Sequence, residues 1–303
     1  MSEKMLPWLH GILPVLPTPF TADDEVDFAV IPRLLDFAAQ SGIRTVVTPA
    51  FGSEFYKLDA GERQCILETT VEHASAHGIK VVAQCNHSTP RLASKLSADA
   101  ARVGAVAVST ALPRAFASSE RQLLDHARRV CDSTELPVIV QDWNPGGVTA
   151  EAPFFIKLHQ HCENFRMAKL EEPGIGETIR RIREETSGHV GVLSGWGGTY
   201  ALQLHSAGLA GLMPGLATAD VFVKIWQNLT AGEFSKALSS FAMISPYLQF
   251  SLQNFEQFHH AEKRLLQRRG IMPHAHVRAV TVDLDIESNS YLDHLTSAIA
   301  QSF

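Results

Sequence analysis

The sequence predicts an α/β fold, a (β/α)8 TIM barrel with a C-terminal helical extension, and three observations support this class. Short apolar runs alternate with amphipathic helical stretches over most of the chain, which is typical of repeated βα units with a parallel sheet. Eight such runs fall within about 215 residues, which favours a barrel over an open sheet. The length of 303 residues leaves room for the helical stretches that follow.

The eight runs are nearly continuous in Val, Ile, Leu or Ala, as expected for strands that are covered on both faces. Between the runs, polar and apolar residues recur with helical spacing, for example over Asp59–His77 and Thr89–Val103. Each run with the helix after it is therefore one unit of the predicted barrel. In chain order the runs are Gly11–Leu16, Thr45–Pro49, Lys80–Gln84, Ala105–Ser109, Pro137–Gln141, Arg166–Leu170, Val190–Leu193 and Leu209–Met213.

Helical patterns alone follow the eighth run. No linker or low-complexity stretch precedes them, so we expect these helices to pack against the barrel rather than to form a separate domain. Gly232 and Gly270 fall at breaks in the pattern, as helix-terminating glycines do. The predicted division is residues 1–216 for the barrel core and residues 217–303 for its last helix and the extension. The expected helices cover roughly Ala219–Leu229, Glu233–Leu248, Leu252–Arg269 and Ser288–Gln301.

Composition and charge argue against several classes of function. The chain is 45% hydrophobic and 19% charged with a net charge of −6, so it can build a large core but offers no basic surface to nucleic acid or an anionic membrane. Neither a secretory signal nor an apolar stretch of about 20 residues is visible. The four cysteines stand alone, which favours reduced thiols. We therefore expect a cytoplasmic protein.

The histidine pairs of the sequence are weak candidates for a metal site. His159 and His161, like His259 and His260, lack the spacing of the common zinc motifs and a nearby carboxylate pattern. We expect them to be solvated helix residues, and we expect no bound metal.

The sixth run carries the most informative pair. Lys169 and Glu171 are two positions apart, so in a strand both side chains point to one face while Leu170 points to the other. Barrel enzymes place their active-site groups at the carboxyl ends of the strands. A lysine among apolar walls favours the free amine, which attacks a ketone to form a Schiff base, and the carboxylate can move protons at the neighbouring carbons. A structural ion pair is the alternative, and spacing alone does not decide between the two.

Residues after the second and fifth runs could also contact a substrate. Gln141 could offer its amide to a hydroxyl group, but from the residues alone we expect an interior glutamine that satisfies backbone groups. Gly52 and Ser53 leave backbone amides open to a carboxylate, although a plain turn is equally consistent with them.

Two more strand ends contribute candidates. Ser194, Gly195 and Trp196 form a loop after the seventh run that is open to close backbone approach, and Met213 ends the eighth run. Barrels often bind phosphate after the seventh strand, but no basic residue stands beside this loop.

The chain resembles the dihydrodipicolinate synthase/N-acetylneuraminate lyase family of class I Schiff-base aldolases and dehydratases. Residues 11–20, GILPVLPTPF, are similar to the family's opening strand. Ser53-Glu54-Phe55 with Leu58 and Glu62-Arg63 are similar to the end of its carboxylate-binding loop and the helix after it. Lys169 stands where the family has its imine-forming lysine. The resemblance implies a barrel that needs no cofactor besides the covalent Schiff base, a small 2-keto acid as substrate, and a homotetramer built as a dimer of dimers.

The chain departs from the common family pattern at two tyrosines. Most members carry one where this chain has Gln141 and another after the strand-four proline, where this chain has Arg114; its four tyrosines lie elsewhere. The 2-keto-3-deoxy-L-arabonate dehydratases are similar to this chain in having Gln-Asp after strand five and Lys-x-Glu in strand six. By this resemblance Lys169 forms the imine, Glu171 moves protons at C3 and to the departing C4 hydroxyl, and Gln141 orients that hydroxyl.

The predicted activity is dehydration of a 2-keto-3-deoxy sugar acid, which makes the protein a carbon–oxygen lyase of the hydro-lyase class. One alternative is a carbon–carbon lyase, a pyruvate-forming aldolase, or a condensing enzyme of the dihydrodipicolinate synthase type. Another is a relative that binds keto acids without catalysis. The residues expected to bind the substrate are Gly52, Ser53, Arg114, Ser194, Gly195, Trp196 and Met213.

Overall fold

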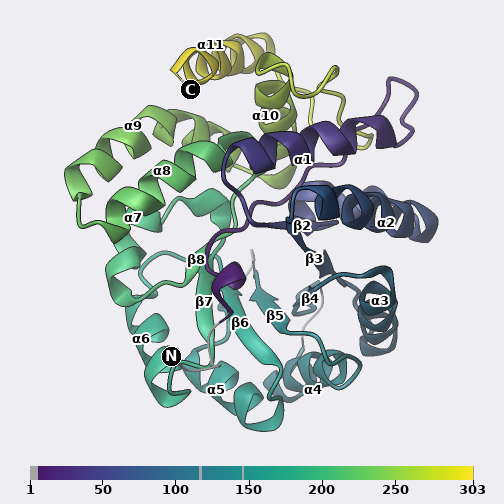
Figure 1. The fold of residues 1–303 in the computed structure, drawn as a ribbon, viewed down its shortest axis with the longest axis vertical. Coiled ribbons are helices and arrows are strands. Elements are labelled where there is room, and N and C mark those ends of the chain that lie inside the picture. Colours follow the sequence, from purple (N-terminus) through teal and green to yellow (C-terminus); the bar gives the residue numbers. More distant parts are fainter. Residues whose placement is uncertain (1–5, 116–117, 145–146, 303) are drawn as a thin grey trace. The chain divides into compact units, whose positions relative to one another are not determined.

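A computed structural model of the protein describes residues 6–115, 118–144 and 147–302. In this part of the chain, strands and helices alternate (Figure 1), and eight strands form a sheet in the order β1-β8-β7-β6-β5-β4-β3-β2. Each strand lies within or overlaps one of the expected runs, so the predicted (β/α)8 fold class is confirmed. The strands are β1 (Gly11–Ile12), β2 (Thr45–Thr48), β3 (Lys80–Gln84), β4 (Ala107–Ala111), β5 (Val138–Asp142), β6 (Phe165–Leu170), β7 (Gly191–Ser194) and β8 (Gly211–Leu212).

Helices follow the strands as expected, and four of them lie beyond β8. Asp59 and Glu62 exchange side-chain to backbone hydrogen bonds at the start of α2, which satisfies two amides that the first helical turn leaves unpaired. The helices are α1 (Ile31–Gln40), α2 (Ala60–Ala76), α3 (Pro90–Val103), α4 (Glu120–Cys131), α5 (Ala152–His161), α6 (Gly176–Glu185), α7 (Ala201–Leu204), α8 (Ala219–Thr230), α9 (Phe234–Ser251), α10 (Phe255–Arg268) and α11 (Ile286–Ser302). Within the described residues, no helix combines the length and apolar character that crossing a bilayer requires.

The chain folds into two compact units. The first takes residues 1–11 and 81–213, and the second takes residues 12–80 and 214–303. Both units are discontinuous in the sequence, whereas the expected division at residue 216 runs along it, and that division stays a prediction.

In the first unit, parallel register places the residues at the strand ends beside one another. Ala111 of β4 pairs with Gln141 of β5, and Gln141 pairs with Lys169 of β6. Every residue of β4 and β5 is buried, because side chains on both faces of these strands are covered. This burial explains why the runs are almost continuously apolar, and it makes the polar side chains among them conspicuous.

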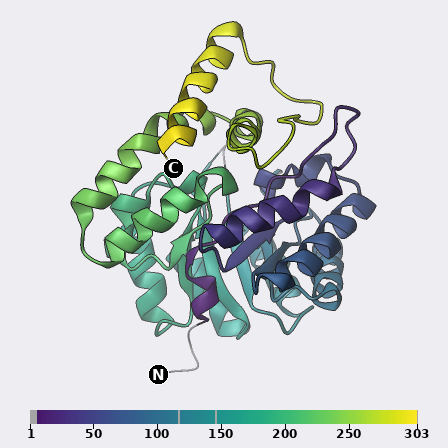
Figure 2. The same cartoon turned by 45° about the horizontal axis from the view of Figure 1, so that its top comes forward.

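In the second unit, the helices beyond β8 pack on one another. The helix α9 contacts α8 and α10, and α11 contacts α9 and α10 (Figure 2). Two short 3-10 turns, Phe51–Ser53 and Phe55–Lys57, follow β2. The first of these turns contacts α10, so a helix from the end of the chain supports a loop from its beginning.

Candidate active site

Lys169 and Glu171 form a buried ion pair at the carboxyl end of β6. The Nζ atom of Lys169 lies 3.0 Å from Oε1 of Glu171, and the two residues are only 7% and 8% exposed. Leu170 between them is also buried, on the opposite face, because side chains alternate along a strand. The two functional groups therefore meet, as their spacing predicts.

Gln141 connects β5 to this pair. Its Nε2 donates to Oε1 of Glu171 at 2.7 Å, and its Oε1 accepts from Nε2 of Gln84 at 3.1 Å. Since an amide group donates only through nitrogen and accepts only through oxygen, these two bonds set the orientation of the Gln141 amide. An interior glutamine was expected to satisfy the backbone, and here it bonds two side chains instead.

Gln84 and Asn86 belong to the same network, although the sequence interpretation did not select them. Gln84 uses its amide nitrogen a second time, donating to Oδ1 of Asn86 at 3.0 Å. That oxygen also accepts from the backbone N–H of Ala111 at 2.6 Å. Both side chains are buried. The rule that selected Gln141, a polar residue ending an apolar strand, selects Gln84 as well when it is applied to the third run.

The loop after β7 holds the other oxygen of Glu171. The backbone N–H of Trp196 donates to Oε2 of Glu171. A Cβ atom on residue 195 would lie 1.9 Å from this same oxygen, so only glycine leaves space for the carboxylate. Gly195 and Trp196 therefore contact the candidate proton-transfer group. Their contact with a substrate stays a prediction.

Ser194 and Met213 lie beside this loop. Ser194 pairs in register with Leu170, so its side chain lies on the face away from Lys169. Its hydroxyl is buried and has no hydrogen-bond partner among the described residues. The backbone N–H of Met213 donates to the carbonyl of Ser194 at 2.9 Å. Substrate contacts of both residues stay predictions.

Arg114 has a carboxylate partner within the protein. Its Nε donates to Oδ1 of Asp142 at 2.8 Å, and its Nη2 donates to Oδ2 at 2.5 Å. Asp142 ends β5, is fully buried, and also accepts from the N–H of Ala150 at 2.6 Å. The planar guanidinium thus already makes the two-bond contact that it favours with carboxylates. A further contact of Arg114 with a substrate anion stays a prediction.

The charge of Glu171 contributes to raising the pKa of two more titratable groups, Glu172 and Tyr200. Burial raises the pKa of Glu172, and the neighbouring charges of Asp142 and Glu171 raise it further, against a hydrogen bond from Thr149. Burial also raises the pKa of the Tyr200 phenol, and Glu172 and Glu171 add to this effect. Negative charge is therefore concentrated at this end of the first unit, with Lys169 and Arg114 as its cationic partners.

Gly52 and Ser53 lie in the second unit, in the turn after β2. The Oγ of Ser53 donates to the carbonyl of Leu16 at 2.5 Å and accepts from the N–H of Ala50 at 2.9 Å. The backbone N–H of Ser53 donates to the carbonyl of Ala50 at 2.9 Å, so both donors of Ser53 already have acceptors within the protein. The structure gives the N–H of Gly52 no acceptor among the described residues. A role of these two residues in holding a carboxylate stays a prediction.

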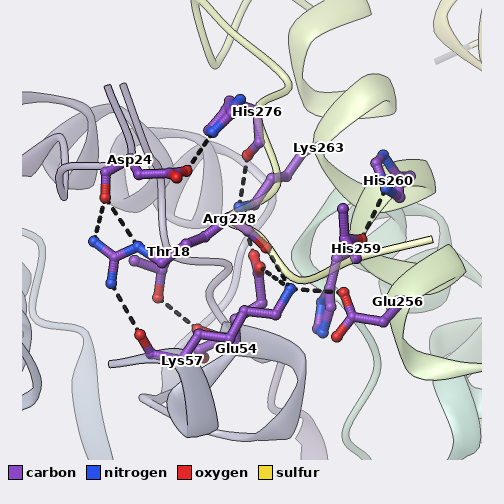
Figure 3. A network of polar contacts seen from close by, with 12 residues as sticks. Thr18, Asp24, Glu54, Lys57, Glu256, His259, His260, Lys263, His276 and Arg278 are labelled. Atoms are coloured by element: carbon purple, nitrogen blue, oxygen red, sulfur yellow. Dashed lines mark hydrogen bonds and ion pairs between the residues drawn. The ribbon is translucent and has the colours of Figure 1, made fainter. Parts of the chain in front are cut away.

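A cluster of charged and polar residues surrounds the end of this turn (Figure 3). One member corrects the sequence interpretation: His259 was expected to be solvated, but it is 1% exposed and its Nε2 lies 3.0 Å from the hydroxyl of Tyr56. Burial lowers the pKa of His259 well below its ordinary value. The expectation was wrong because α10 buries one face against the loop of residues 51–58, which the helix pattern alone does not show.

The chain is similar to several known enzymes. A model of the dihydrodipicolinate synthetase family matches residues 8–299. The L-2-keto-3-deoxyarabonate dehydratase of Azospirillum brasilense is 26% identical over 254 residues, which cover 82% of this chain and 81% of the relative. The 4-hydroxy-tetrahydrodipicolinate synthase of Chlorobium chlorochromatii is 24% identical over 289 residues, 95% of this chain and 96% of the relative. The N-acetylneuraminate lyase of Escherichia coli (strain SE11) is 32% identical over 133 residues, 44% of each chain.

Solved structures show the same fold. The dihydrodipicolinate synthase from Rhodopseudomonas palustris superposes with a TM-score of 0.89 at 23% identity, covering 98% of this chain and all of the other. YagE, a prophage protein of Escherichia coli K12 that was solved in complex with pyruvate, superposes with a TM-score of 0.84 at 22% identity, covering 97% of this chain and 98% of the other. Likeness at this identity establishes the architecture and leaves the reaction to the residues of the site.

Proposed function

The chain belongs to the dihydrodipicolinate synthetase family, and from this premise we propose that it is a lyase which dehydrates a 2-keto-3-deoxy sugar acid through a Schiff base on Lys169. The named relatives include a dehydratase, a synthase and a lyase, so the family supports a lyase. The observation that supports dehydration is the buried set of Lys169, Glu171 and Gln141. In this set a carboxylate, rather than a phenol, lies beside the reactive amine.

The reaction begins when the free amine of Lys169 attacks the C2 ketone and water is lost. Glu171 lies 3.0 Å from this amine, can take a proton from it before the attack, and returns the proton to the C2 hydroxyl as that group leaves as water. In the iminium ion that results, the positive nitrogen draws electrons from the C2–C3 bond region and acidifies the C3 hydrogens. Glu171 removes one of these protons, and the electron pair of the C–H bond forms an enamine.

Elimination follows from the enamine. Its electron pair expels the C4 hydroxyl while the protonated Glu171 returns a proton to the departing oxygen, so that water leaves and a C3–C4 double bond forms. Hydrolysis of the imine then frees Lys169 and releases a product that tautomerises to a semialdehyde or diketo acid. One carboxyl group thus acts as a base and then as an acid.

The amide network supports this use of Glu171. Gln141 and the N–H of Trp196 each donate to one of its oxygens, so the carboxylate keeps its position while it gains and loses a proton. A retro-aldol cleavage instead must deprotonate the C4 hydroxyl, which suits a tyrosinate. One residue before the end of β5 this chain places Gln141, an amide that cannot act as a base.

Further features of the proposal come from the family. We propose that Gly52 and Ser53 hold the substrate carboxylate, and that Arg114, Ser194, Gly195, Trp196 and Met213 contribute to the remaining contacts. The enzyme would use no cofactor, act in the cytoplasm and assemble as a homotetramer. The N–H of Gly52, which has no acceptor among the described residues, supports the first of these assignments.

The Schiff base can be tested by trapping. Reduction with borohydride in the presence of 2-keto-3-deoxy-L-arabonate, followed by peptide mass analysis, should place the adduct on Lys169. A fully active enzyme with an unmodified Lys169 would exclude the mechanism. Coupled detection of pyruvate in a separate assay without borohydride distinguishes dehydration from aldol cleavage, because only cleavage releases pyruvate.

A further inference from the structure

Glu54 is a buried carboxylate held between two lysines in the second unit (Figure 3). Its Oε2 lies 3.1 Å from Nζ of Lys57, and its Oε1 lies 2.5 Å from Nζ of Lys263. Glu54 and Lys263 are both fully buried. Glu54 also has a φ of +57°, a left-handed conformation that is uncommon for residues other than glycine. Glu54 directly follows Gly52 and Ser53, the turn that is proposed to hold the substrate carboxylate.

Lys263 reaches this turn from α10. It donates to the carbonyl of His276 at 2.8 Å, and its Nζ lies 4.3 Å from the centre of the Phe20 ring. Burial lowers the pKa of Lys263 to about 8, although Glu54 favours the charged form. The helix α10 therefore buries the ammonium group of Lys263. Among the described residues, Glu54 is the carboxylate that pairs with it.

The helix α10 contacts the same turn at further points. A Cβ atom on Gly52 would lie 3.2 Å from Cε1 of Phe258, so the backbone of Gly52 passes close to the helix. The rings of Phe51 and Phe255 stack with their centres 5.5 Å apart. The hydroxyl of Tyr56 donates to Glu256 at 2.5 Å. The turn is thus held by α10 on both sides of Gly52.

Stabilising a loop with a buried ion pair has a high free-energy cost. Removing two charges from water carries a large free-energy cost for each ion, and apolar residues of similar size often stabilise a protein at least as well. The left-handed backbone of Glu54 adds a further cost. What the charges specify, beyond stability, is the position of the turn, because an ion pair that is enclosed on all sides holds one geometry.

We propose that Lys263 and Glu54 are positioning residues that direct the N–H of Gly52 toward the carboxylate of the keto acid. The helix α10 then sets the affinity for the substrate without touching it. The inference rests on the proposed function, because it assumes that this turn binds the substrate carboxylate.

The experiment compares two ketones that differ in a carboxylate. Pyruvate carries one beside the ketone, and hydroxyacetone does not. Each is titrated against the full-length enzyme with borohydride, and the concentration that gives half-maximal labelling of Lys169 is measured by peptide mass analysis. In the Lys263→Met variant, we expect the pyruvate concentration to rise by about tenfold, which corresponds to about 1.4 kcal/mol. The hydroxyacetone concentration should not change.

The matched control is Arg269→Met. Arg269 follows α10, and its side chain is 8% exposed and paired with Asp220 at 2.9 Å, so the variant removes a largely buried cation at the end of the same helix without touching the turn. It should leave both titrations unchanged. The proposal is overturned if Lys263→Met leaves the pyruvate titration unchanged, or if it shifts the two ketones equally.

Two further measurements keep the test decisive. If Lys263→Met does not fold, Glu54→Gln, which keeps the side-chain volume and removes the charge, gives the same comparison. If neither ketone labels Lys169 in the wild-type enzyme, the Schiff-base mechanism fails by itself. The positioning role is then tested by the rise in melting temperature that pyruvate causes in the wild-type enzyme. Lys263→Met should abolish this rise, and Arg269→Met should preserve it.

Discussion

Two buried carboxylates, Glu171 in the first unit and Glu54 in the second, are held in different ways. Glu171 contacts one ammonium group, that of Lys169, and its other donors are the neutral amides of Gln141 and the Trp196 backbone. Glu54 lies between two ammonium groups, those of Lys57 and Lys263. Neutral donors orient a carboxylate without neutralising its charge, whereas two cations hold it from both sides by ion pairs. The first arrangement suits proton transfer and the second suits a fixed structure.

The largest effect should come from removing the amine of Lys169, which Glu171 contacts. Lys169→Ala should lower kcat for 2-keto-3-deoxy-L-arabonate by on the order of 10³-fold or more, because no imine can form. The matched control is Lys157→Ala, which removes an exposed lysine of α5 and should leave kcat unchanged. Substantial turnover by the Lys169→Ala variant would rule out covalent catalysis at this residue.

Glu171→Gln tests whether Glu171 transfers protons. The substitution keeps the shape of the side chain and removes its basicity, so kcat should fall by roughly 10²- to 10⁴-fold. Trapping of the imine on Lys169 should persist at a reduced rate, because Glu171 takes the amine proton before the attack but the elimination step is not needed for the imine to form. Normal turnover in this variant would exclude the role in proton transfer and leave the structural ion pair as the better interpretation.

Gly195→Ala tests the position of the Glu171 carboxylate without altering the side chain of Lys169 or Glu171. The added Cβ would lie 1.9 Å from Oε2 of Glu171 and must displace it, so we expect a loss in kcat of about 10²-fold. Gly176→Ala is the control, since its Cβ would meet Ala207 at an ordinary 3.6 Å. Equal activity of the two variants would show that the position of the carboxylate does not limit the reaction.

The smallest effect concerns the pH dependence of stability in the second unit. Burial lowers the folded-state pKa of Lys263 to about 8 from 10.5; Glu54 opposes this effect, and the charges of Lys57 and Arg278 add to it. Between these two values the unfolded chain binds more protons at this residue than the folded one does. Lys263 therefore makes the free energy of unfolding rise with pH, by about 1 kcal/mol per pH unit. Urea unfolding between pH 8 and pH 10 should show a shallower rise in Lys263→Met than in the wild-type protein. Parallel curves would mean that Lys263 keeps an ordinary pKa.

Much of the site around Lys169 and Glu171 could be predicted from local patterns. The strand period placed Lys169 and Glu171 on one face, and the end of the fifth run marked Gln141. The backbone donor to Glu171 could not be predicted in the same way. The N–H of Trp196 reaches the carboxylate through a turn at Gly195, where any side chain would collide with Glu171. The partner of Arg114 was missed because Asp142 lies 28 positions away, on another strand end.

The contacts that hold the turn of Gly52, Ser53 and Glu54 could hardly be predicted from the sequence. Gly52 and Ser53 were identified as small residues after the second run and by resemblance to a family, but their support comes from α10, about 200 positions later in the chain. The helix pattern of residues 255–268 resembles that of any amphipathic helix with charged residues. Whether His259 and Lys263 face solvent or a buried carboxylate depends on what packs against them, and helical spacing does not contain this information.

The sequence by itself determined the class of the fold and the pairing of Lys169 with Glu171, because both follow from short periodic patterns that the backbone geometry of strands and helices imposes. The tertiary structure alone decided which groups hold the two carboxylates, since hydrogen bonds and ion pairs act over about 3 Å and join residues that lie far apart in the chain. For that reason Glu171 contacts one ammonium group and two neutral donors, while Glu54 is held between Lys57 and Lys263.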